Sequence, residues 1–364
     1  MAEFQVLKKR FSECRLVRTP ETEQLPQAAD VDIVVRIESF SFTANNITYA
    51  AAGDQLGYWQ FFPPSGEQTE GWGLIPVWGF AEVVASKVDE VLVGERLFGY
   101  FPPARYLTMT PAKISGQRLM DGAAHRAKLP AGYNSYSRVG GEPGYDRSMD
   151  NERMLLWPLH MTSYCLWDLL QDHNWYGAQQ VIVLSASSKT SIGLAYALDG
   201  DDSAPPSVAL TSSRNLKLVE GLGLYDRCLT YDALADIDAS VATVIVDMSG
   251  SGELLGQLHT HLGDNMKHCI NVGLTHWDEL TPGKGVNAQR SEFFFAPSHI
   301  QKRMQDWGPE GFANRTSAFL SSTALKSRKW LKLRKVDGIA GLAAVYPEVC
   351  EGRIPADEGV IVRL

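Results

Sequence analysis

The sequence has 364 residues, of which 45% are hydrophobic and 21% are charged. This length is more than twice that of an ordinary domain, so we expect two domains with a hydrophobic core in each. The formal net charge of -8 at pH 7 disfavours a nucleic-acid partner, because phosphate binding requires clustered Lys and Arg. A basic cluster does occur at residues 326–335, but its apolar residues alternate with charge, which is typical of a solvated face of a helix or strand.

Cysteine usage and the absence of apolar runs bear on the location of the protein. The five cysteines are odd in number and far apart in the sequence, which makes a poor disulfide framework and favours a reducing compartment. The first residues do not form a charged and apolar leader, and no run approaches the roughly 18 apolar residues that a membrane helix needs. We therefore expect a cytoplasmic protein with no membrane partner.

The first part of the chain is typical of antiparallel β structure. Short runs with alternating apolar residues, broken by Gly and Pro, predict strands and favour a barrel or rolled sheet. Residues 129–153 are polar and rich in turn residues, and they indicate a boundary or loop. The predicted strands lie at residues 31–40, 77–84, 96–100 and 104–110.

The middle of the chain alternates strands with helices. A helix is predicted at residues 155–170, and residues 178–198 then read as a buried strand, a loop of small residues and an apolar helix, which is the first half of a βαβ unit. This alternation predicts a doubly wound parallel sheet. The remaining predictions are strands at residues 207–211, 227–231, 243–250 and 267–273 and a helix at residues 216–222.

The last part of the chain, from residue 291, shows a helical pattern at residues 311–320 and a strand-like end at residues 359–364. A strand that follows the parallel sheet must pair with a partner. Pairing with the first, antiparallel sheet is one economical solution.

The loop at residues 185–191 is the strongest candidate for ligand binding. Small residues let the backbone approach a diphosphate while amides at the helix start point at it, and the hydroxyls and Lys189 would add contacts. The three positions usually filled by glycine fall at Ala186, Ser188 and Ser191, so the strict glycine pattern is absent. A purely structural turn is the alternative, and the surrounding strand and helix favour nucleotide binding.

The end of the second strand of this unit indicates the type of cofactor. An acid there would hold the ribose of NAD, whereas a cation would accept the extra phosphate of NADP. The chain has no acid at this place and has Ser213 and Arg214, followed by Lys217, which favours NADP(H). The alternative is a helix cap, in which Ser212 or Ser213 caps the helix that begins near Leu216.

Metal and nucleophile patterns are missing from the sequence. No two cysteines are near neighbours, and His259 and His261 are two residues apart, a spacing that does not bring side chains to one face of a helix. The Gly-x-Ser-x-Gly turn of hydrolases does not follow a suitable strand. We expect neither a metal site nor covalent catalysis.

Four further segments carry a family resemblance. An apolar strand is followed by Asn45, with Thr48 in place of an expected Asp, and residues 75–84 form a strand that begins with proline. Residues 93–99 include Val-Gly-Glu-Arg, and residues 158–164 precede the nucleotide strand. Together these segments resemble the medium-chain dehydrogenase/reductase superfamily, and more closely its zinc-free, quinone-reductase-like branch. Within the superfamily the chain resembles a bacterial group catalogued as a domain of unknown function.

The resemblance implies an α/β architecture with a GroES-like β-barrel catalytic domain and a Rossmann domain that meet at a cofactor cleft. It places the catalytic domain at residues 1–150, the Rossmann domain at residues 151–290, and a segment that completes the catalytic domain at residues 291–364. It also implies that relatives commonly form homodimers through a sheet edge. The cofactor-binding residues that it implies are Thr162, Ser187, Ser188, Lys189, Thr190, Ser213, Arg214, Tyr231, Met248 and Gly273.

The activity that follows from these expectations is hydride transfer from NADPH to an activated carbonyl, enone or quinone. Without a metal, hydrogen-bond donors must meet the developing negative charge; Tyr49 and Asn45 are the candidates, although Tyr49 could equally be a packed aromatic residue. Two alternatives stay open. One is a nucleotide-binding sensor or partner protein that has the same fold and no activity, and the other is an enoyl reductase acting on thioesters of a carrier protein.

Overall fold

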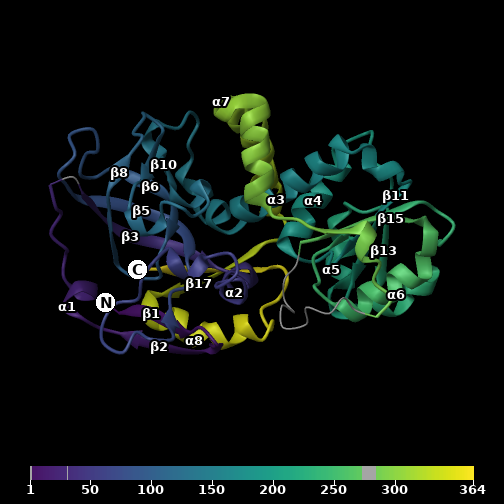
Figure 1. Ribbon diagram of the computed structural model, residues 1–364, viewed down its shortest axis with the longest axis horizontal. Helices are drawn as coiled ribbons and strands as arrows, with labels where there is room; N and C mark the ends of the chain where they lie inside the picture. The colour runs from purple at the N-terminus through teal and green to yellow at the C-terminus, as the bar shows by residue number, and fades with distance from the viewer. Residues whose placement is uncertain (1, 31, 273–283) are drawn as a thin grey trace. The chain divides into compact units, whose positions relative to one another are not determined.

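The computed structural model describes residues 2–30, 32–272 and 284–364 of the chain (Figure 1). These residues divide into two compact units. Unit 1 contains Met1–Leu155 and Leu331–Leu364, and unit 2 contains Leu156–Trp330. Two segments distant in sequence therefore complete unit 1.

Unit 1 is organised around the long strand β3 (Ile33–Phe42), whose β-branched and aromatic residues favour extended structure. Strand β3 pairs in antiparallel fashion with β5 (Val77–Ser86) and with the terminal strand β18 (Glu358–Arg363). In Figure 1 the yellow end of the chain lies against strands from its purple and blue beginning. The expected return of the terminal strand to the first sheet is confirmed.

The other strands of unit 1 extend this sheet or form a smaller one. The larger sheet has the order β17-β18-β3-β5-β6-β10-β9-β8, with β7 paired to β3, and the smaller has the order β2-β1-β4. The unit also contains α1 (Pro20–Glu23), α2 (Ala44–Ala51) and α8 (Gly338–Cys350). The remaining strands are β1 (Glu3–Leu7), β2 (Arg10–Val17), β4 (Trp72–Gly73), β6 (Arg96–Phe101), β7 (Tyr106–Met109), β8 (Pro111–Ala112), β9 (Arg118–Asp121), β10 (Ser135–Arg138) and β17 (Lys332–Asp337).

Strand β10 lies within the stretch that the sequence indicated as a boundary or loop, and that prediction was wrong for these residues. The reason is Tyr136, which is fully buried and donates a hydrogen bond to the carbonyl of Tyr100 at 2.6 Å. Gly99 on β6 leaves the space that the Tyr136 ring fills, because a Cβ there would lie 2.2 Å from the ring. One aromatic side chain thus holds a polar segment in the sheet.

Unit 2 contains a parallel sheet with the order β13-β12-β11-β14-β15-β16 in the described part of the chain. Its central strands are continuous apolar runs, as expected for strands covered on both faces. The bounds of the strands are β11 (Gln180–Leu184), β12 (Ser207–Thr211), β13 (Arg227–Thr230), β14 (Thr243–Asp247), β15 (Met266–Asn271) and β16 (Ser291–Phe293). The helices are α3 (Asp150–Asp172, which begins in unit 1), α4 (Lys189–Asp199), α5 (Leu216–Leu222), α6 (Gly252–Leu262) and α7 (Ala296–Ser327).

Separate hydrophobic cores lie on the two faces of the parallel sheet. Val181 and Val183 of β11 belong to one core, whereas Ile182 and Leu184 belong to the other, because successive residues of a strand point to opposite faces. The doubly wound architecture expected from the sequence is therefore present.

The segment after residue 290 differs from the expected layout. We expected residues 291–364 to complete the first domain, but the chain joins unit 1 only from Leu331. Strand β16 pairs in parallel with β15, and Phe294 and Phe312 belong to the same core as Val181. Helix α7 stays with unit 2 because its apolar residues are buried there.

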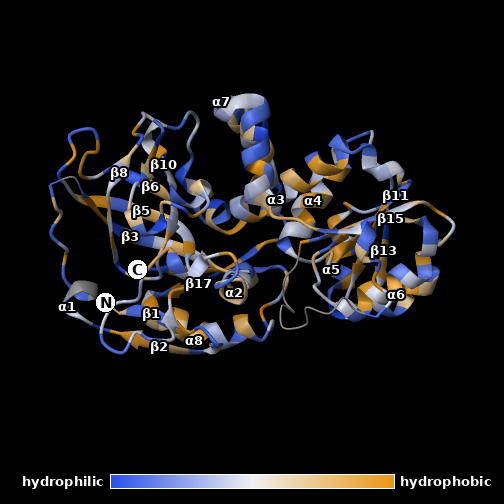
Figure 2. Cartoon of the chain, viewed as in Figure 1, coloured by the Kyte–Doolittle hydropathy of each residue, from blue (hydrophilic) through white to orange (hydrophobic). Residues whose placement is uncertain are grey.

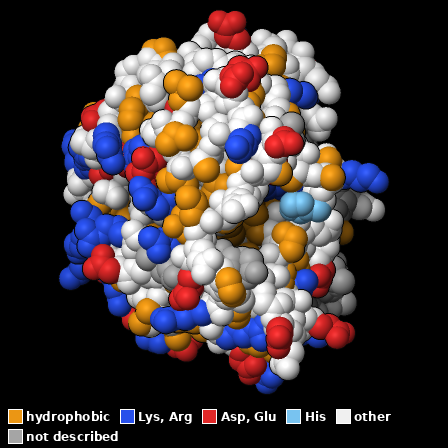
Figure 3. Space-filling model, turned by 90° about the vertical axis from the view of Figure 1, so that its left-hand side faces the viewer, with side chains coloured by type: hydrophobic (Ala, Val, Ile, Leu, Met, Phe, Trp, Pro, Cys, Tyr) orange, Lys and Arg blue, Asp and Glu red, His pale blue; other side chains and the backbone are white. Residues whose placement is uncertain are grey.

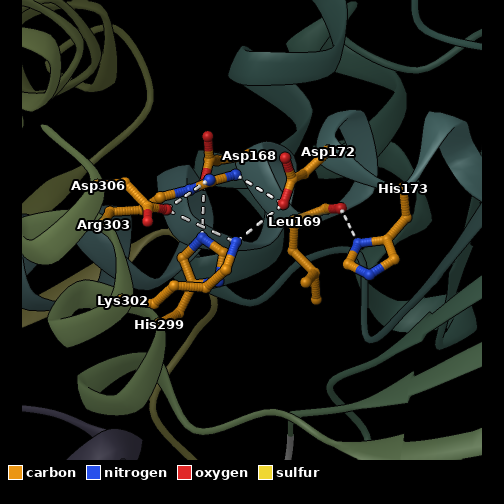
Figure 4. A network of polar contacts seen from close by, with 8 residues as sticks. All are labelled: Asp168, Leu169, Asp172, His173, His299, Lys302, Arg303 and Asp306. Carbon is orange, nitrogen blue, oxygen red and sulfur yellow. Dashed lines mark hydrogen bonds and ion pairs between the residues drawn. The ribbon is translucent and has the colours of Figure 1, made fainter.

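Ion pairs fasten α7 to α3 (Figure 4). The buried carboxylate of Asp168 lies 2.6 Å from both His299 Nε2 and Arg303 Nε, and Arg303 also reaches Asp172 at 3.0 Å. The helix carries many hydrophilic residues (Figure 2) and bends at Gly308, where φ is 72°. Breaking a buried pair of this kind from one side typically costs about 3 to 5 kcal/mol.

The basic cluster at residues 326–335 forms the end of α7 and strand β17. Lys332 pairs with Asp357 at 2.7 Å and Arg334 pairs with Glu348 at 2.8 Å, so acidic neighbours offset part of the positive charge. On the face of the molecule in Figure 3, basic and acidic side chains are likewise interspersed. Among the described residues, no helix combines the length and the apolar character needed to span a membrane.

The close contact of α4 with α3 gives a stability test. A methyl group at Gly193 of α4 would lie 2.5 Å from Ser163 Oγ and 2.6 Å from His160 Cδ2. We expect Gly193→Ala to lower the free energy of unfolding by about 1 to 3 kcal/mol through overpacking. The matched control is Gly221→Ala in α5, where an added Cβ meets nothing within 4 Å; it should raise stability by about 0.5 to 1 kcal/mol. Urea titration measures both, and equal effects would contradict the packing account.

Candidate functional site

The candidate site in unit 2 is the loop of residues 185–188, which connects β11 to α4. Ser188 is the N-cap of α4, and its Oγ accepts a hydrogen bond from the amide of Ser191 at 3.1 Å. The expected strand, loop and helix are present in that order. The first amides of a helix lack intrahelical acceptors and can serve an anion, but the amide of Ser191 is already used by the cap.

The left-handed position of this loop is Ser185, with φ of 56°. None of the three positions expected for glycine, Ala186, Ser188 and Ser191, has a positive φ, and the left-handed residue directly precedes the first of them. A non-glycine residue in this conformation costs about 1 to 2 kcal/mol. The turn is held by the amide of Ala186, which donates to the carbonyl of Leu210 at 3.0 Å, and by hydrogen bonding between Tyr231 and Ser185, which opposes the rise that burial causes in the Tyr231 pKa.

Met248 follows the end of β14 and lies against the loop. Its Sδ is 3.1 Å from Ser191 Oγ and 3.8 Å from Ser188 Oγ, and the two hydroxyls are 2.8 Å apart. The structure therefore brings together the residue after β14 and two residues from the start of α4. The preceding residue, Asp247, is buried and accepts from both the amide and the hydroxyl of Ser249, which fixes the course of the chain after β14.

The end of β12 is tied to the loop through Ser187. The buried Ser187 Oγ accepts from Asn215 Nδ2 at 2.9 Å and lies 3.4 Å from Thr211 Oγ1. Ser213 and Arg214, in a short 3-10 helix (Ser213–Asn215), are exposed next to this link. Sequence reasoning missed Asn215, whose only signal was its place directly before a helix.

The alternative role for the residues after β12 was a helix cap. Helix α5 begins at Leu216 with Asn215 as its N-cap residue, and neither Ser212 nor Ser213 caps it in the part of the chain that the structure describes. The helix-cap interpretation is therefore wrong for both serines.

Tyr225 is a second residue that sequence reasoning missed. Its hydroxyl lies 3.3 Å from the carbonyl of Ala186 and 3.2 Å from the carbonyl of Ser191. It thus supports both the loop and the first turn of α4. No motif marks Tyr225, because the contact joins segments that are more than thirty residues apart in the sequence.

Helix α3 supplies the remaining contacts to the start of α4. Ser163 Oγ donates to the carbonyl of Thr190 at 2.7 Å. The expected cofactor residue Thr162 uses its hydroxyl within α3, where it donates to the carbonyl of Pro158 at 3.2 Å. Lys189 and Thr190 are half-buried in the first turn of α4, and Gly273 lies outside the described residues.

The candidate residues of unit 1 lie on helix α2. Thr43 and Asn46 form a capping box at its start, and Asn46 Nδ2 donates to the carbonyl of Pro76 at 2.9 Å. Asn46 is thus structural, whereas Asn45 is half-buried and hydrogen-bonds to Tyr49. The structure brings the two expected catalytic residues together.

Tyr49 is 6% exposed, and its Oη accepts a hydrogen bond from Trp78 Nε1 at 3.2 Å. Burial raises the pKa of Tyr49 to about 12, although hydrogen bonds from Trp78, Asn45 and Tyr133 oppose this rise. The phenol therefore remains protonated at neutral pH and can donate. Its ring contacts Tyr58 and Tyr100 at centroid distances of 4.6 and 5.6 Å, so the residue is both packed and chemically competent.

Side chains that could bind a metal ion are dispersed in the described part of the chain. Within residues 2–30, 32–272 and 284–364, no three His, Cys, Asp or Glu side chains gather as metal ligands would. His259 and His261 both lie on α6. The Nε2 atom of His261 contacts the carbonyl of Ile237 at 2.8 Å.

Comparison with known proteins places this geometry in context. The pattern of a family described as "Protein of unknown function (DUF2855)" matches residues 40–355, and no curated protein matches the sequence. The solved structure of CurA from Vibrio vulnificus is similar with a TM-score of 0.64 and 11% identity, covering 100% of this chain and 98% of that chain. A putative NADPH:quinone reductase from Bacillus thuringiensis has a TM-score of 0.57 and 12% identity over 100% and 98% of the two chains.

A third similar structure is an alcohol dehydrogenase superfamily protein from Novosphingobium aromaticivorans, with a TM-score of 0.55 and 16% identity over 100% of this chain and 99% of that chain. At these identities the likeness establishes the fold. The expected medium-chain dehydrogenase/reductase fold, with a GroES-like and a Rossmann domain, is confirmed.

His160, which packs beside the candidate loop, gives a pH test. Its Nδ1 lies 2.8 Å from Thr323 Oγ1, and burial lowers its pKa from 6.5 to about 3. In the unfolded chain His160 therefore binds a proton near pH 6.5, whereas in the folded chain it stays neutral at that pH. The free energy of unfolding consequently falls as the pH drops below 6.5. This site alone should remove about 2 kcal/mol between pH 7 and pH 5.

Denaturant titration of wild type and His160→Gln at the two pH values isolates this contribution. The variant should lose about 2 kcal/mol less than wild type on acidification. If the two proteins lose the same amount, His160 is not held neutral by burial.

Proposed function

The chain belongs to the DUF2855 family of proteins of unknown function, and we propose that it is an NADP(H)-dependent oxidoreductase that works without zinc. The observation that carries the proposal is the hydroxyl-lined loop between β11 and α4, with Arg214 after the neighbouring strand β12. The similarity in fold to a putative NADPH:quinone reductase supports the same conclusion.

The residues of unit 2 fit a dinucleotide. A diphosphate needs small side chains and donors, and the loop offers Ser188, Lys189 and Thr190 at the start of a helix. Ser187 is bonded to Asn215, so its part is to hold the loop against the end of β12. Tyr225 supports the loop through the carbonyls of Ala186 and Ser191, and Met248, after β14, contacts the hydroxyl of Ser191.

The choice of NADP(H) over NAD(H) rests on charge. Ser213 and Arg214 are exposed at the end of β12, where a 2′-phosphate would be recognised. Arg binds phosphate through paired hydrogen bonds that are roughly twice as strong as neutral ones. Tyr231, beside Ser185, would contribute to the adenosine side of the same site.

The chemistry follows from the cofactor and from the residues of unit 1. When bound, NADPH would supply a hydride to an activated carbonyl, enone or quinone. Tyr49 and Asn45 would donate hydrogen bonds to the negative charge that develops on the substrate, and one such donor is worth about 2.7 to 4 kcal/mol in the transition state. Because these donors would stabilise the negative charge on the substrate, the proposed reaction requires no zinc. Tyr49 would then give up its proton to the reduced product.

We extend the proposal to a cytoplasmic homodimer acting on a small molecule. The cysteines are free in the structure, which suits a reducing compartment. Strand β16 is the edge strand of the parallel sheet among the described residues and carries the exposed Phe293. An edge strand of this kind can pair with its copy about a two-fold axis.

The role of Arg214 is tested by calorimetric titration with NADPH and NADH. We expect Arg214→Ala to weaken NADPH binding by roughly 10- to 100-fold, the loss of about 1.5 to 3 kcal/mol from a hydrogen bond to a charged group, with little change for NADH. The matched control is Arg227→Ala, an exposed arginine at the opposite, amino end of β13, which should bind NADPH like wild type. Wild-type protein that binds neither nucleotide would refute the proposed function.

Turnover is tested separately with a panel of quinones and enals, following loss of NADPH absorbance. Oxidation that depends on Tyr49 supports the oxidoreductase. NADPH binding without oxidation of any acceptor would instead favour a nucleotide sensor with the same fold.

A further inference from the structure

The phenol groups around Tyr49 form a hydrogen-bonded chain within unit 1. Tyr133 Oη lies 3.0 Å from Tyr58 Oη, and Tyr133 also hydrogen-bonds to Tyr49. The ring of Tyr133 contacts those of Tyr49 and Tyr58 at centroid distances of 6.3 and 5.7 Å. Tyr133 therefore connects the candidate proton donor to a second phenol.

Exposure is greatest in the middle of this chain, at Tyr133. Tyr49 is 6% exposed and Tyr58 is 5% exposed, whereas Tyr133 is half-buried and thus the most accessible of the three. Water can reach Tyr133 more readily than it can reach Tyr49. The step from Tyr133 to Tyr49 thus leads from the more exposed residue toward the candidate donor.

Neighbours of Tyr49 differ in what they can do with a proton. The indole of Trp78 only donates a hydrogen bond, and the amide of Asn45 does not exchange a proton with a phenol under ordinary conditions. A phenol can accept a proton on one lone pair while it releases its own. Of the groups that hydrogen-bond to Tyr49, Tyr133 is the one suited to return a proton.

We propose that Tyr133 is a positioning residue that orients the Tyr49 hydroxyl and restores its proton during the reduction. This inference rests on the proposed function. The Tyr49 O–H bond breaks as a new bond to hydrogen forms on the substrate, which has received a hydride while the nicotinamide is oxidised. The Tyr133 proton moves to Tyr49, and water replaces it on Tyr133. Each turnover thus consumes one hydride from NADPH and one proton from solvent.

The same cluster contains an internal control. Tyr100 is fully buried, and its ring lies 4.7 Å from that of Tyr133. Its hydroxyl has no hydrogen-bond partner among the residues that the structure describes. Removing this hydroxyl takes away a phenol from the cluster without interrupting the chain from Tyr133 to Tyr49.

The experiment compares Tyr133→Phe with Tyr100→Phe in the NADPH oxidation assay. We expect Tyr133→Phe to lower kcat by roughly 10- to 100-fold, at or below the lower end of what general acid catalysis contributes because Tyr49 itself remains, with NADPH affinity unchanged and a larger solvent deuterium isotope effect. Tyr100→Phe should keep kcat within about twofold, because its hydroxyl lies outside the chain. A kcat and an isotope effect for Tyr133→Phe that match wild type would overturn the inference.

A second variant tests the relay if Tyr133→Phe does not fold. Replacement of Tyr133 by 3,5-difluorotyrosine keeps the shape and lowers the pKa of the phenol, so the pH profile of kcat should move to lower pH. An unmoved profile would contradict the relay. If wild type oxidises no NADPH, the proposed function fails and the relay with it; if wild type is active and both Tyr133 variants behave like it, the relay alone fails.

Discussion

The bend between β11 and α4 reverses the chain over the carboxyl edge of a parallel sheet, and it does so without a glycine. Ser185 adopts the left-handed conformation, and the hydroxyls of Ser187 and Ser188 bond the loop to Asn215, after β12, and to the first turn of α4. A glycine-rich loop makes the same turn because glycine adopts the left-handed conformation readily. Here side-chain hydrogen bonds hold a fixed path, which leaves fewer backbone amides for a ligand and makes the loop more rigid before a ligand arrives.

This rigidity links the two halves of the proposed function. A preformed loop loses little conformational freedom when a diphosphate binds, so under the proposed function few amides and Arg214 would suffice to hold the cofactor. In unit 1 the aromatic packing around Tyr49 has a similar effect, because a buried phenol with fixed neighbours needs little rearrangement as charge develops. Under the proposed function, each unit would thus carry one preorganised part of a hydride-transfer enzyme.

The sequence predicted the elements that depend on local pattern. The apolar run of β11, the small residues after it and the helix α4 were all recognisable, as was the return of β18 to the first sheet. It could not predict contacts between distant residues, such as Tyr225 beneath the loop or Asp168 with Arg303, because no periodicity encodes them. Strand β10 was not predicted for the same reason, since its Tyr136 is held by a hydrogen bond to Tyr100 and by the space at Gly99. The left-handed conformation of Ser185 was not predicted, because serine gives no signal for that conformation.

The central claim is that this glycine-free loop binds a dinucleotide diphosphate, and the ³¹P NMR spectrum of NADPH tests it directly. With excess protein, the account predicts that the diphosphate resonances and the 2′-phosphate resonance all shift or broaden. If the diphosphate resonances stay sharp and unshifted while the protein is folded, the loop does not hold the cofactor and the account is contradicted.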